Sequence, residues 1–258
     1  GSGGDEIGGG YSYYVSAWYL DLLKENNLNN LHSRFFKLIN EVKNYSVTNE
    51  QFILGSLTNL FRPGLATVDG SIYKKDNILN KDFTRDFEKD SFKIKKPFIS
   101  YMRNAQYADL FHLKLPRCLR YIDRASMRNS IEARVPFLDH KVVEACFSVP
   151  SKYKILNNMQ RIITKYPFKN IIDKQKLYQN KMTIADPQSF WLRNSLKELV
   201  NDTFNSNNFS CAQIFNKNFV KQYYFDYCKE KEKHINSFFL LQILLTELWF
   251  KNILNNNL

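Results

Sequence analysis

The sequence is poor in the residues from which metal centres and disulfide frameworks are built. It holds four cysteines and four histidines in 258 residues, and no two cysteines have a CxxC spacing. These residues are scattered along the chain: Cys118, Cys146, Cys211, Cys228, His32, His112, His140 and His234. The scatter argues against a zinc site and against a disulfide-rich secreted fold, and it predicts a cytoplasmic location.

Long apolar runs are also lacking, and no signal-peptide pattern of basic and then apolar residues is visible. The strongest candidate for a membrane span is FFLLQILLTELWFKNIL, residues 238–254, but Gln242, Thr246, Glu247 and Lys251 interrupt it. A span needs about 20 consecutive apolar residues. The segment therefore predicts a buried amphipathic helix, and we expect no membrane partner.

Blocks of like charge are missing although the formal net charge is +12. The densest run, KEKEKH at 229–234, alternates in sign like a solvated helix face. A charge excess spread this thinly makes nucleic acid an unlikely partner. The hydrophobic share of 44% and the aromatic share of 15% predict a folded chain with an ample core.

Alternating strand patterns are almost absent, so the fold class expected is mostly α. Helical periodicity covers 11–26, 31–39, 49–61, 97–129, 217–233 and 235–253. Pro116 predicts a break between two helices, and Asp139 predicts the N-cap of a short one. The segments 72–96 and 180–191 are expected to be loops, the first with room for a short helix.

The opening segment GSGGDEIGGGYSYY, residues 1–14, is instead rich in glycine. Glycines allow close backbone approach to a ligand, and the adjacent Asp5 and Glu6 suit Mg²⁺ held together with substrate phosphates. The alternative interpretation of the same residues is a flexible linker in which the acidic residues have no role. The segment does not fit the pyrophosphate loop SGGxDS, because the spacer is missing and Glu6 stands where a hydroxyl is needed.

A longer motif, LPRCLRYIDRASMRNSIEARVPFLDHKVVE at 115–144, resembles the signature LPxxLxxxDRxSMxxSxExRxPFLD of the glutamine-hydrolysing asparagine synthetase family. The opening is similar to the second glycine-rich turn of that family, SGxGADExFGGY. The segment KMTIADPQSFWLR at 181–193 resembles KxGFxxPxxxWL, and LLQILLTELWF at 240–250 is similar to the last helix of the family.

The resemblance spans 1–258 and implies the helical C-terminal portion of an α/β ATP-pyrophosphatase domain, of the adenine nucleotide alpha hydrolase-like type. The parallel sheet, the SGGxDS loop and the N-terminal glutaminase domain are then expected to be absent from these residues. We therefore expect the 258-residue chain to be inactive by itself, because adenylate chemistry needs the pyrophosphate loop to orient the leaving group.

The family activates the side-chain carboxylate of aspartate with ATP and Mg²⁺, and ammonia from glutamine then displaces AMP. The resemblance implies an ATP-binding role for Gly1, Ser2 and Gly3, and catalytic roles for Asp5, Glu6 and Lys181. Asp5 is also the expected Mg²⁺ ligand, and Glu132 and Arg134 are the expected substrate-binding residues. The alternatives are a turn contact for Asp5, a helix-capping charge for Glu6, an ordinary exposed lysine for Lys181 and a buried Arg–carboxylate network within 123–139.

The main departure from the family pattern is Ser2, which stands where the synthetases have Glu. A hydroxyl cannot act as a carboxylate base near neutral pH, so the acceptor is less certain than the amide-forming chemistry. Two alternatives stay open. One is a related amidotransferase or β-lactam-type synthetase with another acceptor, and the other is a degenerate, non-catalytic binding module. Thr183 and Ile184 also replace the Gly and Phe of the KxGF motif.

Overall fold

The structure is a computed structural model that describes residues 2–25, 78–88, 94–156, 159–178, 187–229 and 237–254. The predicted stripes at 31–39 and 49–61 lie outside these residues, as do Gly1 and Lys181. The described residues hold helices and no strand, apart from the isolated bridges Leu79–Phe215 and Leu156–Met159. The expectation of a mostly α chain is confirmed for this part of the sequence.

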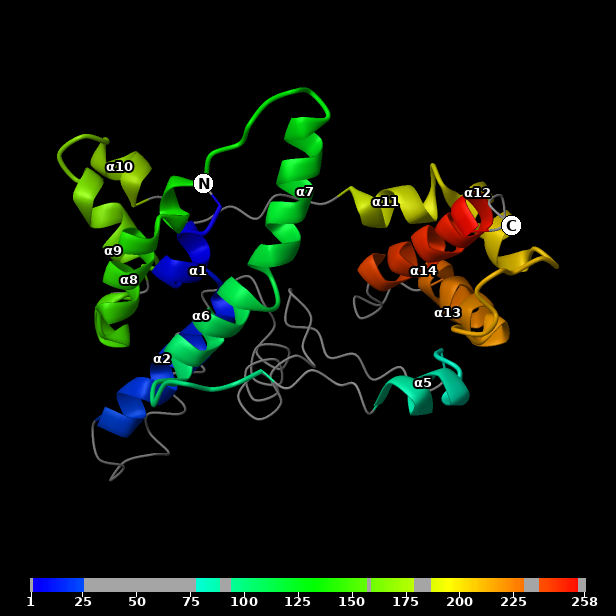
Figure 1. Ribbon diagram of the computed structural model, residues 1–258, viewed down its shortest axis with the longest axis horizontal. Coiled ribbons are helices and arrows are strands. Elements are labelled where there is room, and N and C mark those ends of the chain that lie inside the picture. Colours follow the sequence, from blue (N-terminus) through cyan, green and yellow to red (C-terminus); the bar gives the residue numbers. More distant parts are fainter. Residues whose placement is uncertain are drawn as a thin grey trace. The chain divides into compact units, whose positions relative to one another are not determined.

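The chain divides into two units, residues 1–73 with 93–181 and residues 74–92 with 182–258 (Figure 1). The described helices of the first unit are α1 (Gly4–Gly8), α2 (Ser12–Glu25), α6 (Tyr101–Phe111), α7 (Leu115–Met127), η1 (Pro136–Leu138), α8 (His140–Ser148), η2 (Ser151–Tyr153), α9 (Ile162–Lys165), η3 (Tyr166–Phe168) and α10 (Lys174–Leu177). Those of the second are α5 (Lys81–Glu88), α11 (Gln188–Arg193), α12 (Lys197–Asn205), α13 (Lys217–Lys229), α14 (Ser237–Trp249) and the π-helical turn η4 (Phe250–Leu254).

Helices α2 and α6 lie side by side in the first unit (Figure 1). A buried cluster joins them, made of Tyr14, Val15, Ala17, Met102 and Ile155. A second cluster, made of Ile7, Leu110 and Leu115, fixes α1 against α6 and α7. Short α1 is therefore held by apolar contacts on one side, which a five-residue helix needs because it is not stable alone.

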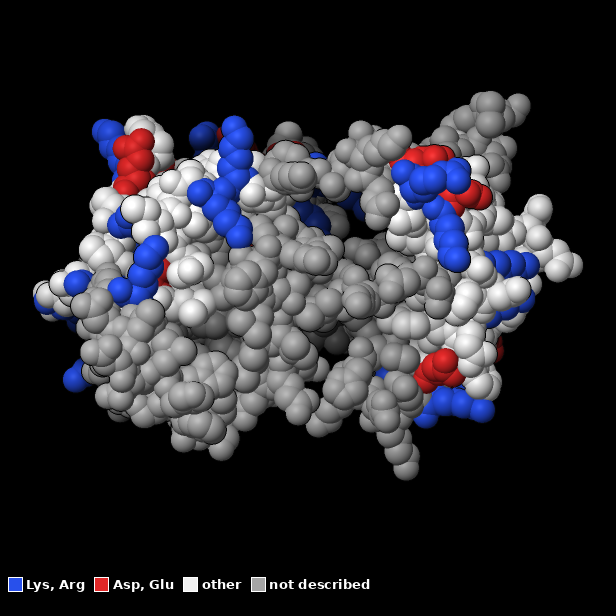
Figure 2. Space-filling view, turned by 90° about the horizontal axis from the view of Figure 1, so that it is seen from below, with Lys and Arg blue, Asp and Glu red and all other residues white. Residues whose placement is uncertain are grey.

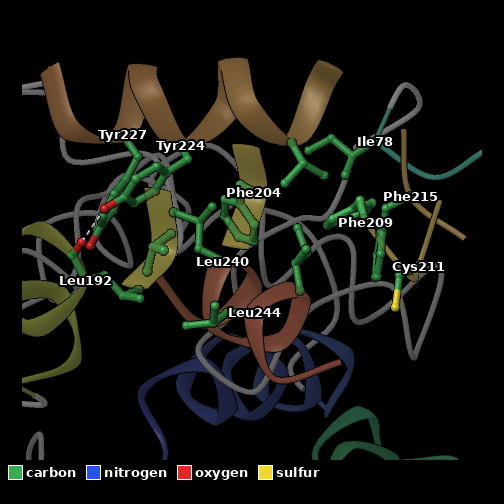
Figure 3. Packing of buried hydrophobic residues seen from close by; sticks show 13 residues of the cluster. Ile78, Leu192, Phe204, Phe209, Cys211, Phe215, Tyr224, Tyr227, Leu240 and Leu244 are labelled. Atoms are coloured by element: carbon green, nitrogen blue, oxygen red, sulfur yellow. Dashed lines mark hydrogen bonds between the residues drawn. The ribbon is translucent and has the colours of Figure 1, made fainter. Parts of the chain in front are cut away.

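The second unit is built around α12, α13 and α14. Figure 3 shows Phe204, Tyr224 and Leu240 in its buried cluster, where the Tyr224 hydroxyl donates to the Leu192 carbonyl oxygen at 2.7 Å. Helix α14 buries Leu240, Ile243, Leu244 and Glu247, so the predicted burial of one face is confirmed. The helix is not amphipathic as predicted, because Phe238, Leu245 and Trp249 leave its other face apolar and exposed. None of the described helices is both long and apolar enough to cross a membrane.

Local signals place several helix ends correctly. Pro116 lies in the first turn of α7, where a missing N–H costs nothing, and α6 ends before it at Phe111. Asp139 caps α8 by accepting hydrogen bonds from the N–H groups of Lys141 and Val142. The loop expected at 180–191 is wrong at its end, because α11 begins at Gln188, directly after Pro187. A proline preset near helical φ favours such a start.

Candidate functional site

The glycine-rich opening folds into α1 and the turns on either side of it. Gly3 and Gly9 have positive φ values of 92° and 76°, which L side chains rarely adopt. A Cβ atom at Gly3 would overlap Leu138, and one at Gly9 would overlap Met102. These glycines are therefore required by backbone conformation and by close packing, which excludes the flexible-linker interpretation for residues 3–9.

Asp5 lies in α1 with its side chain 22% exposed, and its Oδ1 atom is 3.4 Å from Nη1 of Arg161. Oδ1 itself is buried, so the exposed part of the side chain is the remainder of the carboxylate and its methylene. Arg161 precedes α9 in a left-handed conformation with a φ of 63°. A non-glycine residue held there stores strain of about 1 kcal/mol or more, a feature typical of functional sites.

Glu6 is 3% exposed and accepts a hydrogen bond from the Tyr11 hydroxyl at 2.6 Å. Burial raises the pKa of Tyr11 far above its usual range, and the neighbouring Glu6 carboxylate raises it further. The Nζ atom of Lys114 lies 3.2 Å from the centroid of the Tyr11 ring. The Glu6 side chain therefore points away from solvent and belongs to a buried polar cluster with Tyr11.

Asp109 of α6 belongs to the same cluster and was not singled out by the sequence. It accepts hydrogen bonds from the hydroxyls of Tyr13 at 2.5 Å and Tyr14 at 2.7 Å. Burial raises the pKa of Asp109, and the two tyrosine hydroxyls oppose that rise. The signal that could have found it is a pair of polar residues, Gln106 and Asp109, at helical spacing within the apolar face of α6.

Glu132 and Arg134 lie in the extended segment that follows α7, and they form an ion pair with each other at 3.0 Å. Their side chains are 69% and 81% exposed. Asp123, Arg124 and Asp139 are exposed as well. The buried Arg–carboxylate network considered for this signature is therefore wrong, because the charged side chains of the segment face solvent in this chain.

A surface hollow of about 620 Å³ lies in the first unit, and none of the expected site residues lines it. Its walls are Leu156, Met159, Ile162, Lys174, Gln175 and Tyr178. Among the described residues no group of three or more His, Cys, Asp and Glu side chains is placed to hold a metal ion. A divalent cation at the α1 turn would therefore need ligands from a bound substrate in addition to Asp5.

The described basic side chains do not merge into one patch on the face seen in Figure 2. The described Lys and Arg residues stand singly or in small groups there, several of them beside Asp or Glu. Counterion-driven binding of nucleic acid uses several cations in register with the phosphates. Among the described residues on this face, the positive charge is dispersed.

The model of the Asparagine synthase family matches residues 1–251. The chain belongs to the asparagine synthase family. Glutamine-hydrolyzing asparagine synthetase 1 of Bacillus subtilis (strain 168) is 26% identical over 150 residues, which are 58% of this chain and 23% of that protein. Asparagine synthetase 3 of the same strain is 37% identical over 59 residues, 23% of this chain and 10% of the relative.

A putative asparagine synthetase of Mycobacterium bovis (strain ATCC BAA-935 / AF2122/97) is 31% identical over 88 residues, 34% of this chain and 14% of that protein. No solved structure matches the chain. The matched segments thus span less than a quarter of each of these relatives. The family is shown over most of the chain, and the homology to these synthetases is distant.

Proposed function

We propose that the chain is the C-terminal part of the ATP-pyrophosphatase domain of a glutamine-dependent amide ligase that makes asparagine. In the reaction the side-chain carboxylate of aspartate attacks the α-phosphorus of ATP, and pyrophosphate leaves. Ammonia derived from glutamine then attacks the acyl carbon of the adenylate, and AMP leaves. The family match over residues 1–251 supports ATP as the substrate.

The observation that carries the proposal is the α1 turn, where glycines in left-handed conformations precede and follow a helix that presents Asp5. In our proposal Ser2 and Gly3, with Gly1 before them, line the nucleotide with backbone groups. Oδ1 of Asp5 is buried 3.4 Å from Nη1 of Arg161, and in our proposal the Asp5 carboxylate also serves one Mg²⁺ bound to the phosphates. Mg²⁺ would neutralise charge that develops on those phosphates.

The other expected residues take supporting roles in the proposal. Glu6, buried against Tyr11, acts as a fixed negative charge beneath the turn. Glu132 and Arg134, exposed and paired, bind the acceptor, since a guanidinium can fork onto a carboxylate or a phosphate. Lys181, outside the described residues, stabilises phosphate charge in the transition state. The pyrophosphate loop, the parallel sheet and the glutaminase domain are assigned to a part of the enzyme beyond these residues.

The test is aspartate-dependent exchange of radiolabelled pyrophosphate into ATP by the natural polypeptide that contains this chain. We expect Asp5→Asn to slow exchange at least about a hundredfold, the range typical of lost transition-state charge stabilisation. Asp82→Asn is the matched control, because Asp82 is an exposed carboxylate of α5 that forms a surface ion pair with Arg85 and lies in the other unit. Equal rates for Asp5→Asn and the parent protein would remove Asp5 from the mechanism.

Ser2 favours a second candidate function, in which the same adenylate chemistry acts on another carboxylic acid. The exchange assay separates the two when it is run with aspartate, a β-amino acid, a sugar acid and a peptide. Exchange that is fastest with aspartate supports asparagine synthesis, whereas exchange with another acid alone assigns the protein to a related ligase. Absence of exchange with every acid would overturn both.

A further inference from the structure

Gln106, in the middle of α6, makes a contact with α1 that the family motifs do not include. Its side chain is fully buried, and its Nε2 atom donates to the carbonyl oxygens of Glu6 at 2.6 Å and Ile7 at 2.8 Å. These carbonyls lie in the last turn of α1, where a helix has no internal donors left for them. The amide of Gln106 therefore caps the C-terminal end of α1 and fixes α1 against α6.

Lys154, which follows η2, determines which way this amide points. Its side chain is fully buried, and Nζ donates to Oε1 of Gln106 at 2.8 Å. An ammonium group has donors only, so it binds the oxygen of the amide and leaves the NH₂ group to face α1. Three segments far apart in the sequence, at 6–7, 106 and 154, are thus connected by one chain of hydrogen bonds.

The surroundings of Lys154 make this an unusual place for a cation. The pKa of Lys154 is lowered to about 8, first by burial and then by the positive charge of Arg103, while Cys146 and Asp21 oppose the fall. The ring of Phe147 lies 5.3 Å from Nζ. A fully buried lysine that hydrogen-bonds an amide costs free energy that a methionine of similar length would not. This points to a use other than stability.

We propose that Gln106 and Lys154 are positioning residues that hold the α1 turn in its nucleotide-binding conformation before ATP arrives. The inference rests on the proposed function, since it assigns the turn to ATP. A five-residue helix with glycines at both ends would otherwise sample many conformations, and that freedom would have to be lost on binding. With the amide in place, the backbone groups near Gly3 and the carboxylate of Asp5 are already oriented.

The first measurement is hydrogen–deuterium exchange, followed by mass spectrometry, of the natural polypeptide without nucleotide. Gln106→Glu keeps an acceptor for Lys154 but loses both donors to α1, and Lys154→Met removes the group that orients the amide. Both substitutions are expected to speed amide exchange within residues 4–10. Lys217→Met is the matched control, because Nζ of Lys217 in α13 likewise donates to an amide oxygen, here the backbone carbonyl oxygen of Ser206 in the other unit. It should leave residues 4–10 unchanged.

The second measurement is the ATP dependence of pyrophosphate exchange. If the turn is ordered a tenth of the time, the apparent dissociation constant for ATP rises about tenfold. The KM for ATP should therefore rise about tenfold in Gln106→Glu, with a smaller rise in Lys154→Met. The kcat at saturating ATP should fall less than threefold, whereas general loss of folded enzyme would lower kcat and leave KM alone.

Unchanged amide exchange within residues 4–10 in both variants would overturn the inference, whatever the activity. So would faster amide exchange with an unchanged KM for ATP. If the parent protein exchanges no pyrophosphate with any acid, the proposed function fails instead. In that case, faster amide hydrogen exchange of α1 in Gln106→Glu and Lys154→Met, but not in the Lys217→Met control, would still show that the two residues hold the turn.

Discussion

At the scale of single residues, the buried charges of the first unit have consequences that depend on pH. Lys154 has a pKa of about 8 in the folded protein, below the ordinary value of 10.5. Between these values the unfolded chain binds more protons than the folded one. Stability from this residue is therefore reduced at neutral pH and recovers as the pH rises through that window.

We predict that the free energy of unfolding of the parent protein rises relative to that of Lys154→Met between pH 7.5 and 9.5. The expected gain is about 1–2 kcal/mol, because one pKa unit corresponds to about 1.4 kcal/mol. Urea unfolding at three pH values measures it. Both proteins carry Cys146→Ala for this comparison, because the charge of Lys154 lowers the pKa of the Cys146 thiol and that titration would differ between them. The range stops at pH 9.5 because of Tyr11, Tyr13 and Tyr14, whose pKa values are raised in the folded protein. At higher pH these tyrosines ionise in the unfolded chain first, which lowers the free energy of unfolding. A flat difference would contradict the prediction.

At the scale of elements, α6 depends on a cap that comes from another helix. Asp21 of α2 is 6% exposed and accepts hydrogen bonds from Ser100 Oγ at 2.5 Å, Tyr101 N at 2.7 Å and Met102 N at 3.2 Å. Ser100 is itself the N-cap of α6 and accepts from Arg103 N. The start of α6 is thus capped twice, once by its own sequence and once by α2.

We predict that Asp21→Ala lowers the free energy of unfolding by about 2–3 kcal/mol, because buried backbone donors lose their partner. Asp21→Asn, which keeps an acceptor oxygen, should lose less. Asp82→Ala on exposed α5 serves as the control and should change stability by less than about 0.5 kcal/mol. Chemical denaturation followed by far-UV circular dichroism gives all three values. Equal losses for Asp21→Ala and Asp82→Ala would show that the cap contributes nothing.

At the scale of the whole molecule, the buried clusters of the described residues each lie within one unit. The second unit also has its own buried charge. Glu247 of α14 is fully buried and accepts hydrogen bonds from Ser210 N and Cys211 N, both at 2.8 Å. Lys251 pairs with it at 3.5 Å. This one carboxylate therefore fixes the turn before α13 to the last helix.

We predict that Glu247→Ala destabilises the second unit by about 3 kcal/mol, because it leaves two backbone donors and one cation without their buried acceptor. Hydrogen exchange should quicken in peptides from 200–215 and 240–249 and stay unchanged in peptides from α2 and α6. Glu247→Gln, which keeps an acceptor, should have a weaker effect. Equal acceleration in both units would show that they unfold together.

The sequence by itself determined the helical character, the family and the glycine turn. Helical periodicity is a local property, and the caps at Asp139 and Pro116 act within a few residues of themselves. The spacing of the family motifs can be read directly from the sequence, so the family could be predicted without the structure. The loop predicted at 180–191 extends too far, because a proline such as Pro187 fits a loop and the start of a helix equally well.

Only the tertiary structure showed that Gln106 binds α1 and Lys154 binds Gln106. It also showed that Arg161 pairs with Asp5 and that Asp109 accepts hydrogen bonds from two tyrosine hydroxyls. It also showed that the charges of the long signature are exposed rather than buried. These partners lie between 48 and 156 residues apart in the chain. Hydrogen bonds act over about 3 Å, so such pairs exist only after the helices have packed.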